Sequence, residues 1–233
     1  MTDESLESGK ISADRPETGG PAAHRTVVVK VGGSLLDWPE LGSRLQCWLA
    51  ALGTPRVVLV VGGGPAADLV CQRDRWDDLG EDKSHWLAVR AMTFISFLME
   101  GLLEDAKVVA SMRQCESLWH DGIIPILDVH TFMVDDSAAG SPLPERWNVT
   151  SDSIAARVAR GLGADELVLL KSVAWPDADI AEAARRGIVD EHLMHELRHA
   201  PRLKVRIENF RDDARQCQTL NNQAENSQAN APS

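Results

Sequence analysis

Two runs of β-branched residues, each ending in consecutive glycines, constrain most strongly how this chain can fold. Residues Thr26–Val31 (TVVVKV) lead into Gly32-Gly33-Ser34, and Arg56–Val61 (RVVLVV) leads into Gly62-Gly63-Gly64-Pro65. An apolar run of this length is typical of a strand buried on both faces, and such strands belong to parallel sheets covered by helices. Each glycine stretch therefore marks the turn from a buried strand into the next helix.

The rest of the central sequence continues this alternation. Helices are expected between Pro39 and Gly53, directly after Pro65, and over Ser84–Asp105, Ser151–Leu162 and Asp190–His199. Further strands are expected over Ile123–Val129, Glu166–Leu170 and Leu203–Ile207. The alternation predicts an α/β fold, a three-layer αβα sandwich with a mainly parallel central sheet. In such sheets ligands bind beyond the carboxyl ends of the strands.

The two ends of the chain differ in composition from its centre. Residues 1–24 are rich in Ser, Glu, Asp, Gly and Pro, and residues 212–233 are rich in Asn, Gln and Ala. Such compositions bury too little apolar surface to offset chain entropy, so both ends are expected to be disordered tails. One folded domain over residues 25–211 remains.

Composition limits the partners of this domain. The formal net charge of −11 argues against a nucleic-acid partner, which requires a basic face. The apolar runs are too short to span a bilayer, and the polar N-terminus is unlike a signal peptide. The four scattered cysteines form no CxxC pair, which argues against a disulfide framework or a metal site and fits a reduced cytoplasmic chain. A small phosphorylated ligand stays possible, because a few cations and backbone N–H groups can hold one locally.

The two glycine-rich loops are candidate phosphate sites. Neither loop matches the P-loop or the GxGxxG pattern. Glycines still let the backbone approach a ligand and aim N–H groups at phosphate oxygens, and the following helix adds its positive end. Each loop alone is equally compatible with a simple tight turn, whereas two at one sheet edge favour a phosphate site. The candidate residues are Gly32, Gly33, Ser34, Gly62, Gly63 and Gly64.

Two charged residues, Lys30 and Asp152, are further candidates for the site formed by these loops. Lys30 interrupts an otherwise apolar strand, where burial is costly without an anionic partner. A phosphate near the glycine amides would neutralise it, although its ammonium group could instead reach solvent at the strand end. Asp152 follows Thr150 and Ser151, either of which can cap the expected helix. Asp152 is then either a first-turn acid favoured by the helix dipole or a buried anchor for a lysine, and the sequence leaves both open.

Three motifs, in this order, resemble those of the amino acid kinase superfamily. They are KVGGS at Lys30–Ser34, VVGGGP at Val60–Pro65 and NVTSD at Asn148–Asp152. The superfamily includes acetylglutamate, aspartate, uridylate and isopentenyl phosphate kinases. The resemblance extends from about Val27 to Asn209. It implies ATP-dependent phosphoryl transfer to a small molecule, with Mg²⁺ arriving on the ATP phosphates.

Three further segments are similar to a narrower group, the kinases of methanofuran biosynthesis in one-carbon metabolism. These segments are SHWLAVRAM at Ser84–Met92, WNVTSDSIA at Trp147–Ala155 and VDE at Val189–Glu191. That group phosphorylates [5-(aminomethyl)furan-3-yl]methyl phosphate to the diphosphate. The similarity therefore implies a phosphate monoester as acceptor, with UMP or isopentenyl phosphate as the alternatives.

The resemblance also implies roles for matching residues. Lys30 would bind the transferring phosphoryl group, and Asp152 would orient the lysine side of the site. Gly32 and Gly33 would donate N–H groups to the donor phosphates, and Gly62, Gly63 and Gly64 would line the acceptor and γ-phosphate region. His85 and Arg90 are candidate contacts to the acceptor's phosphate, although a surface histidine and a solvated arginine fit as well. Further candidates for substrate binding are Asn148, Thr150 and Ser151. Homo-oligomers are common in the superfamily, so one is expected here.

The segment Leu170–Asp177 (LKSVAWPD) departs from the family pattern. Family members usually follow this strand with a TDVDG-like loop under the nucleoside, and its acid and glycine are missing here. Lys171 at the strand end is a candidate for the second phosphate-binding lysine, and the short segment predicts a reduced nucleoside subsite. These departures keep a rival interpretation open, a non-catalytic binding or storage protein on the same fold.

Overall fold

The two valine-rich runs form neighbouring central strands of one parallel sheet. A computed structural model describes residues 25–54, 56–175 and 179–212, so the expected tails lie outside the described residues apart from Asp212. The six strands follow the order β3-β4-β2-β1-β5-β6, and every pair is parallel. Their bounds are β1 Thr26–Val31, β2 Arg56–Val61, β3 Ala106–Val109, β4 Ile124–Leu127, β5 Glu166–Lys171 and β6 Lys204–Asn209.

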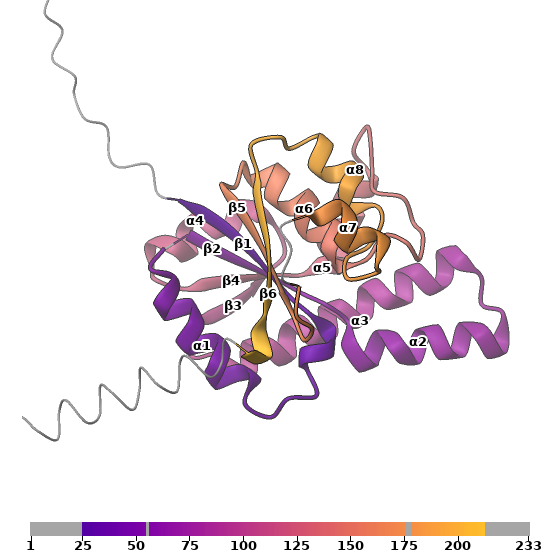
Figure 1. Ribbon diagram of the computed structural model, residues 1–233, viewed down its shortest axis with the longest axis horizontal. Coiled ribbons are helices and arrows are strands. Elements are labelled where there is room, and N and C mark those ends of the chain that lie inside the picture. Colours follow the sequence, from indigo (N-terminus) through magenta and orange to yellow (C-terminus); the bar gives the residue numbers. More distant parts are fainter. Residues whose placement is uncertain (1–24, 55, 176–178, 213–233) are drawn as a thin grey trace, which may run out of the picture.

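Helices cover both faces of the sheet, which confirms the predicted three-layer α/β sandwich (Figure 1). Their bounds are α1 Leu41–Leu52, α2 Gly64–Asp77, α3 Glu81–Leu102, α4 Cys115–His120, α5 Val129–Ser137, α6 Ser151–Leu162, α7 Ile180–Arg185 and α8 Leu193–Arg198. Short 3₁₀ turns lie at Gly33–Leu35 and Met112–Gln114. Helices α2 and α3 lie side by side and extend away from the sheet (Figure 1).

The alternation of side chains along β1 and β2 creates two cores. Val28, Val58 and Val60 pack on one face, against residues of α5, α6 and α8 among others. Val29 and Leu59 face the opposite core with α1 and the later part of α3. Both faces of these strands are buried, which explains why the two runs are apolar almost throughout.

Some element boundaries differ from those expected. The long helix covers Glu81–Leu102 instead of Ser84–Asp105, and β3, α4, α5 and α7 were not anticipated. The strand expected over Ile123–Val129 stops at Leu127 because Asp128 caps a helix. The Asp128 carboxylate accepts hydrogen bonds from the backbone N–H groups of His130 and Thr131.

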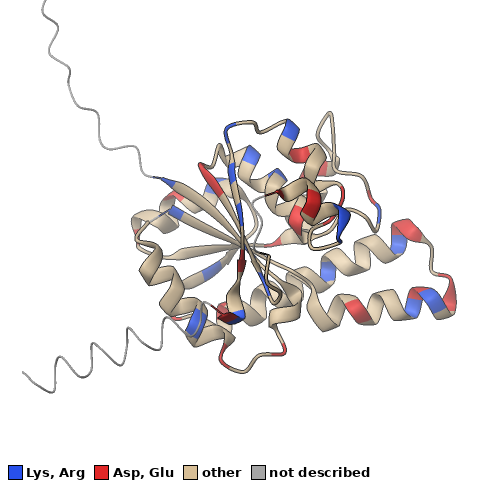
Figure 2. Ribbon diagram, in the orientation of Figure 1, with Lys and Arg blue, Asp and Glu red and all other residues tan. Residues whose placement is uncertain are grey.

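Charge and cysteine chemistry also bear on the expectations. Figure 2 shows acidic and basic residues interspersed over the helices. Cys71 and Cys115 are free thiols, whereas Cys47 is disulfide-bonded, so the expectation of reduced cysteines is wrong at Cys47. None of the described helices combines the length and apolarity needed to cross a membrane.

We predict that Leu59→Ala lowers the free energy of unfolding by about 2–5 kcal/mol, because it opens a cavity beneath a central strand. Leu59 is fully buried, at 0% exposure. The matched control is Leu69→Ala on α2, where the leucine is 58% exposed and the loss should stay within about 0.5 kcal/mol. Urea unfolding of both variants measures the difference, and equal losses would contradict the burial of β2.

Candidate active site

The carboxyl ends of β1, β2 and β5 meet at one edge of the sheet. Lys30 lies one residue before the end of β1, in register with Val60 of β2 and Leu169 of β5. Past the strand ends the loops stay attached, since the N–H of Gly32 donates to the Leu170 carbonyl and the N–H of Gly62 donates to the Val31 carbonyl, both at 2.9 Å. The parallel register thus brings both glycine loops and Lys171 to the same place.

A buried carboxylate joins two lysines at this edge. Asp152 in the first turn of α6 places Oδ2 at 2.6 Å from Lys171 Nζ and Oδ1 at 3.0 Å from Lys30 Nζ. The side chains of Asp152, Lys30 and Lys171 are 3%, 5% and 12% exposed. Lys30 therefore does not extend into solvent, and Asp152 contacts both lysines. One carboxylate between two ammonium groups leaves a net positive charge in a poorly solvated place.

This arrangement shifts the ionisation of its members. Burial opposes the charged form of Asp152, but the two lysines outweigh it and hold the pKa of the carboxyl below its ordinary value. Burial and then repulsion from Lys30 lower the pKa of Lys171 to about 8, and attraction to Asp152 offsets this only in part. An additional anion beside Lys171 would restore its ordinary affinity for a proton.

The start of α6 is held by a residue that the sequence did not single out. Neither Thr150 nor Ser151 caps the helix with its own side chain, contrary to expectation. Asp190 instead accepts hydrogen bonds at Oδ2 from the N–H of Thr150 (3.2 Å), the hydroxyl of Thr150 (2.7 Å) and the N–H of Ser153 (3.0 Å). Asp190 thereby fixes the turn that carries Asp152. The VDE segment was the available signal, but its partner lies 40 residues away.

The two glycine loops touch backbone to backbone. A Cβ atom on Gly33 would lie 2.4 Å from the nitrogen of Gly64, and one on Gly62 would lie 2.8 Å from the nitrogen of Gly33. A Cβ on Gly32 would lie 2.7 Å from the carbonyl oxygen of Leu170. These distances are too short for any side chain, so glycine is needed for the loops to approach each other. The N–H of Gly32 already donates to the Leu170 carbonyl, so Gly32 is not a donor to phosphate as expected. The amides of Gly33 and Ser34 remain the candidate donors of this loop.

A pocket of about 400 Å³ opens beside these loops. It is lined by Gly33, Ser34, the glycines of the second loop, Ser151 and residues of α2 and α3. His85 lines it and is 3% exposed, and its buried Nε2 has no hydrogen-bond partner. Burial lowers the pKa of His85 below its ordinary value. Arg90 is exposed and does not line this pocket, so the structure does not place it with the other candidates.

A second pocket, of about 490 Å³, lies on the Lys171 side. Asn148, Asp152 and Lys171 line it, together with Asp190 and the segment that follows α7. Trp147 and Thr150 line both pockets, so the two spaces adjoin across the start of α6. The altered segment after Lys171 borders this side, and its residues 176–178 lie outside the described residues. Most sequence candidates thus line one of two adjoining pockets, whereas Lys30 reaches the second pocket only through its contact with Asp152, and Gly32 and Arg90 line neither.

The fold is an α/β sandwich in which two glycine-rich loops and the Lys30–Asp152–Lys171 cluster meet at the carboxyl edge of the sheet. The model of the amino acid kinase family matches residues 25–174, and the chain belongs to this family.

Individual relatives are more distant. The chain is 25% identical over 183 residues to the chloroplastic acetylglutamate kinase of Arabidopsis thaliana, which covers 64% of this chain and 53% of that protein. The chain thus spans about half the length of the curated relative it matches.

Two solved structures show the same fold. The uridylate kinase of Archaeoglobus fulgidus has a TM-score of 0.57 at 17% identity, covering 83% of this chain and 95% of that chain. The UMP kinase of Bacillus anthracis has a TM-score of 0.56 at 16% identity, covering 84% and 93%.

We predict that Asp152→Asn lowers the free energy of unfolding at pH 7 by about 3–5 kcal/mol, because two buried ammonium groups lose their counter-charge. The effect should depend on pH. Lys171 binds its proton less tightly in the folded than in the unfolded chain, so stability rises as pH increases from about 8 towards 10.5. In the variant the pKa of Lys171 falls further, so this rise begins at lower pH.

The matched control is Asp179→Asn, which changes an exposed helix cap that asparagine also serves. Urea titrations at pH 7 and pH 9 measure all three proteins. Equal stability of Asp152→Asn and Asp179→Asn at pH 7 would show that Asp152 is no more than a helix-start acid.

Proposed function

We propose that this protein transfers the γ-phosphoryl group of ATP to a small phosphate monoester and forms a diphosphate. The observation that carries the proposal is the buried Lys30–Asp152–Lys171 cluster, of which Asp152 and Lys171 line the second of the two adjoining pockets. Its excess positive charge suits the charge that spreads over a phosphoryl group in transfer. Two spaces with a shared wall suit a donor and an acceptor brought end to end.

The donor fits the Lys171 side. Lys171 would contact the ATP phosphates, and Lys30, at the end of β1 beside both glycine loops, would contact the group in transfer. The amides of Gly33 and Ser34 add neutral donors near the same point. The protein needs no covalent step, because alignment and charge neutralisation supply most of the rate in this reaction class.

Magnesium fits this site as a companion of ATP. Both oxygens of Asp152 are engaged by the lysines, so that carboxylate is not available as a metal ligand. Mg²⁺ would therefore be held by the phosphates and by water, as is common for this ion. Its chemistry there is to neutralise phosphate charge.

The acceptor fits the smaller pocket beside α2 and α3. Its walls include the apolar side chains of Ala67, Ala88, Val89, Met92 and Ile154, with one carboxylate from Asp68. An apolar ring with a primary ammonium group matches this lining, and [5-(aminomethyl)furan-3-yl]methyl phosphate has both. UMP and isopentenyl phosphate, the acceptors considered as alternatives, carry no ammonium group for Asp68. His85 Nε2 is a further polar contact available to the acceptor.

An acceptor panel tests the function. The protein is incubated with Mg–ATP and, separately, the aminomethylfuran phosphate, UMP and isopentenyl phosphate, and formation of ADP and of the diphosphate is followed by a coupled assay and phosphorus NMR. We expect the highest kcat/KM with the aminomethylfuran phosphate. Turnover with UMP alone would favour the uridylate alternative. ATP binding without turnover on any acceptor would favour the alternative of a non-catalytic binding or storage protein, which the altered loop after Lys171 suggests.

We predict that Lys30→Ala reduces kcat by about a hundredfold or more, because it removes a preorganised charge from the transferring group. Lys107→Ala is the control, since that lysine is 63% exposed on β3 and pairs with Glu100. Steady-state assays on both proteins, with circular dichroism to check folding, give the comparison. Near-normal turnover in a folded Lys30→Ala protein would place the transfer site elsewhere.

The expected homo-oligomer and cytoplasmic location remain proposals. Exposed apolar side chains gather on α3, where Phe94, Phe97 and Leu98 are 63%, 56% and 46% exposed. A second copy of a chain with charge −11 meets least repulsion at such an uncharged face. Light scattering at micromolar concentration should give twice the mass of one chain, and a monomer mass would contradict this assembly.

A further inference from the structure

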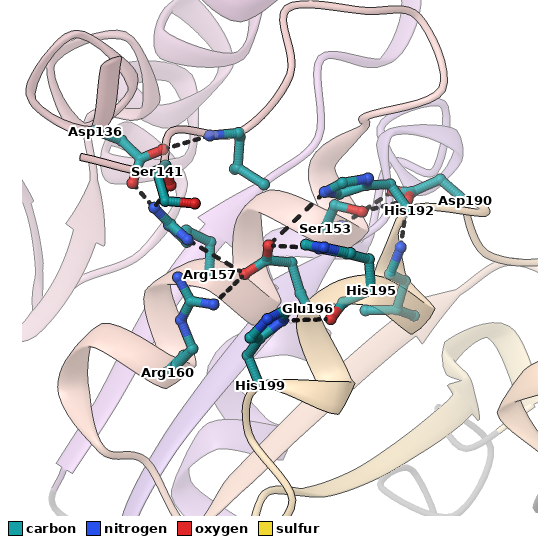
Figure 3. A network of polar contacts seen from close by, with 12 residues as sticks. Asp136, Ser141, Ser153, Arg157, Arg160, Asp190, His192, His195, Glu196 and His199 are labelled. Atoms are coloured by element: carbon teal, nitrogen blue, oxygen red, sulfur yellow. Dashed lines mark hydrogen bonds and ion pairs between the residues drawn. The ribbon is translucent and has the colours of Figure 1, made fainter. Parts of the chain in front are cut away.

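A second polar cluster lies on α8, separate from the lysines of the candidate active site. His192, His195 and Glu196 each offer one ligand atom, and these atoms all lie within 4.8 Å of one another. Figure 3 shows both histidine rings directed toward the Glu196 carboxylate, with two arginines on its other side. Nothing in the proposed phosphoryl transfer uses these residues.

The spacing within the cluster suits a bridging ion better than direct hydrogen bonds. Glu196 Oε1 lies 3.7 Å from His192 Nε2 and 3.5 Å from His195 Nδ1. Both distances exceed the range of a good N–H···O hydrogen bond. Ligands about 2.0–2.1 Å from a tetrahedral zinc ion lie roughly 3.3–3.4 Å apart, so small side-chain movements would complete the geometry. The half-exposed ring of His195 would supply most of that movement and would shift from its present contacts with the rings of His192 and His199.

Two of the three side chains in this cluster are largely buried, and one of them lacks a hydrogen-bond partner. The side chains of Glu196 and His192 are 2% and 15% exposed. His192 Nε2 is buried and has no hydrogen-bond partner. Buried polar atoms are normally paired, so an unpaired imidazole nitrogen facing a carboxylate oxygen calls for an explanation.

The arginines orient the carboxylate. Glu196 Oε2 lies 3.3 Å from Arg160 and 3.7 Å from Arg157, and Arg157 is in turn held by Asp136 at 2.7 Å. These contacts at Oε2 are ion pairs without hydrogen bonds, and Oε1 faces the histidines. Outer contacts of this kind commonly fix the ligating oxygen of a metal-bound carboxylate. The charge of Arg160 also repels a cation, which limits affinity and gives a specific variant to test.

The sequence His195-Glu196-Leu197-Arg198-His199 has the spacing of the HExxH zinc motif, but the geometry differs from that motif. The helix ends at Arg198, and His199 Nδ1 contacts the carbonyl oxygen of His195 at 2.9 Å. Glu196 is tied to two arginines and is not free as a base. The ligand set is therefore His192, His195 and Glu196, and a hydrolase role does not follow.

We propose that His192, His195 and Glu196 bind one divalent transition-metal ion, zinc by preference, with water completing the coordination. Two imidazoles and one carboxylate suit zinc and its neighbours in the first transition row and not magnesium, which prefers oxygen ligands. Helix α8 packs on α6, so the bound ion would brace the segment against the sheet-covering layer. The role is structural, and it does not depend on kinase activity.

Calorimetric titration of the full, chelator-treated chain with zinc chloride, without nucleotide or magnesium, tests the site. We expect one equivalent to bind and the melting temperature to rise. His195→Ala should weaken binding by about tenfold or more, because it removes a direct ligand and leaves the ion pairs of Glu196 intact. Arg160→Gln should tighten binding, since it removes a repelling charge.

Two control variants exclude other zinc ligands. His120→Ala changes a histidine that is 89% exposed on α4, and Cys71→Ser removes a partly exposed free thiol. Both should bind zinc as the unaltered chain does, and the cobalt-substituted protein should show tetrahedral absorption without a thiolate band. Absence of zinc uptake, unchanged affinity in His195→Ala, or loss of binding in Cys71→Ser would each overturn the proposal. Should His195→Ala fail to fold, His195→Gln replaces it under the same criteria.

Discussion

The ion cluster in which Asp152 holds Lys30 and Lys171 is the interaction on which the rest of the site depends. Two lysines on adjacent strands would repel each other in a buried place, and the carboxylate between them makes their approach possible. The register of β1 against β5 sets the separation of the two lysines, and the first turn of α6 sets the position of the Asp152 carboxylate. The cluster keeps one positive charge in excess, which an anion can neutralise.

Helix α6 links this cluster to the second one. Its first turn carries Asp152, and its later turns carry Arg157 and Arg160, which contact Glu196 of α8. Asp190, just before α8, caps the start of α6. Asp190 and Glu196 therefore attach the segment after β5 to both the first and the later turns of α6. This attachment explains how the second pocket keeps a defined wall although the loop after Lys171 departs from the family pattern.

Sequence patterns predicted what depends on neighbouring residues. The bounds of β1, β2 and α6 follow from apolar runs, glycines and a helix start, and the lone lysine in TVVVKV pointed to the site. Features that depend on distant partners were not predictable in the same way. Asp190 meets Thr150 across 40 residues, and Asp128 ends a strand early by capping α5. The clash that makes Gly33 necessary arises from Gly64, on another loop, and no local pattern reveals it.

The most direct test is proton uptake on nucleotide binding, measured by calorimetry with Mg–ATP at pH 8 in buffers of different ionisation enthalpy. The pKa of Lys171 is about 8 in the protein without ligand, so Lys171 is uncharged in about half of the protein molecules at pH 8. Phosphates placed beside Lys171 raise its pKa, so binding should take up as much as about half a proton, and Lys171→Met should abolish this uptake. ATP binding without proton uptake, or with the same uptake in Lys171→Met, would contradict the account.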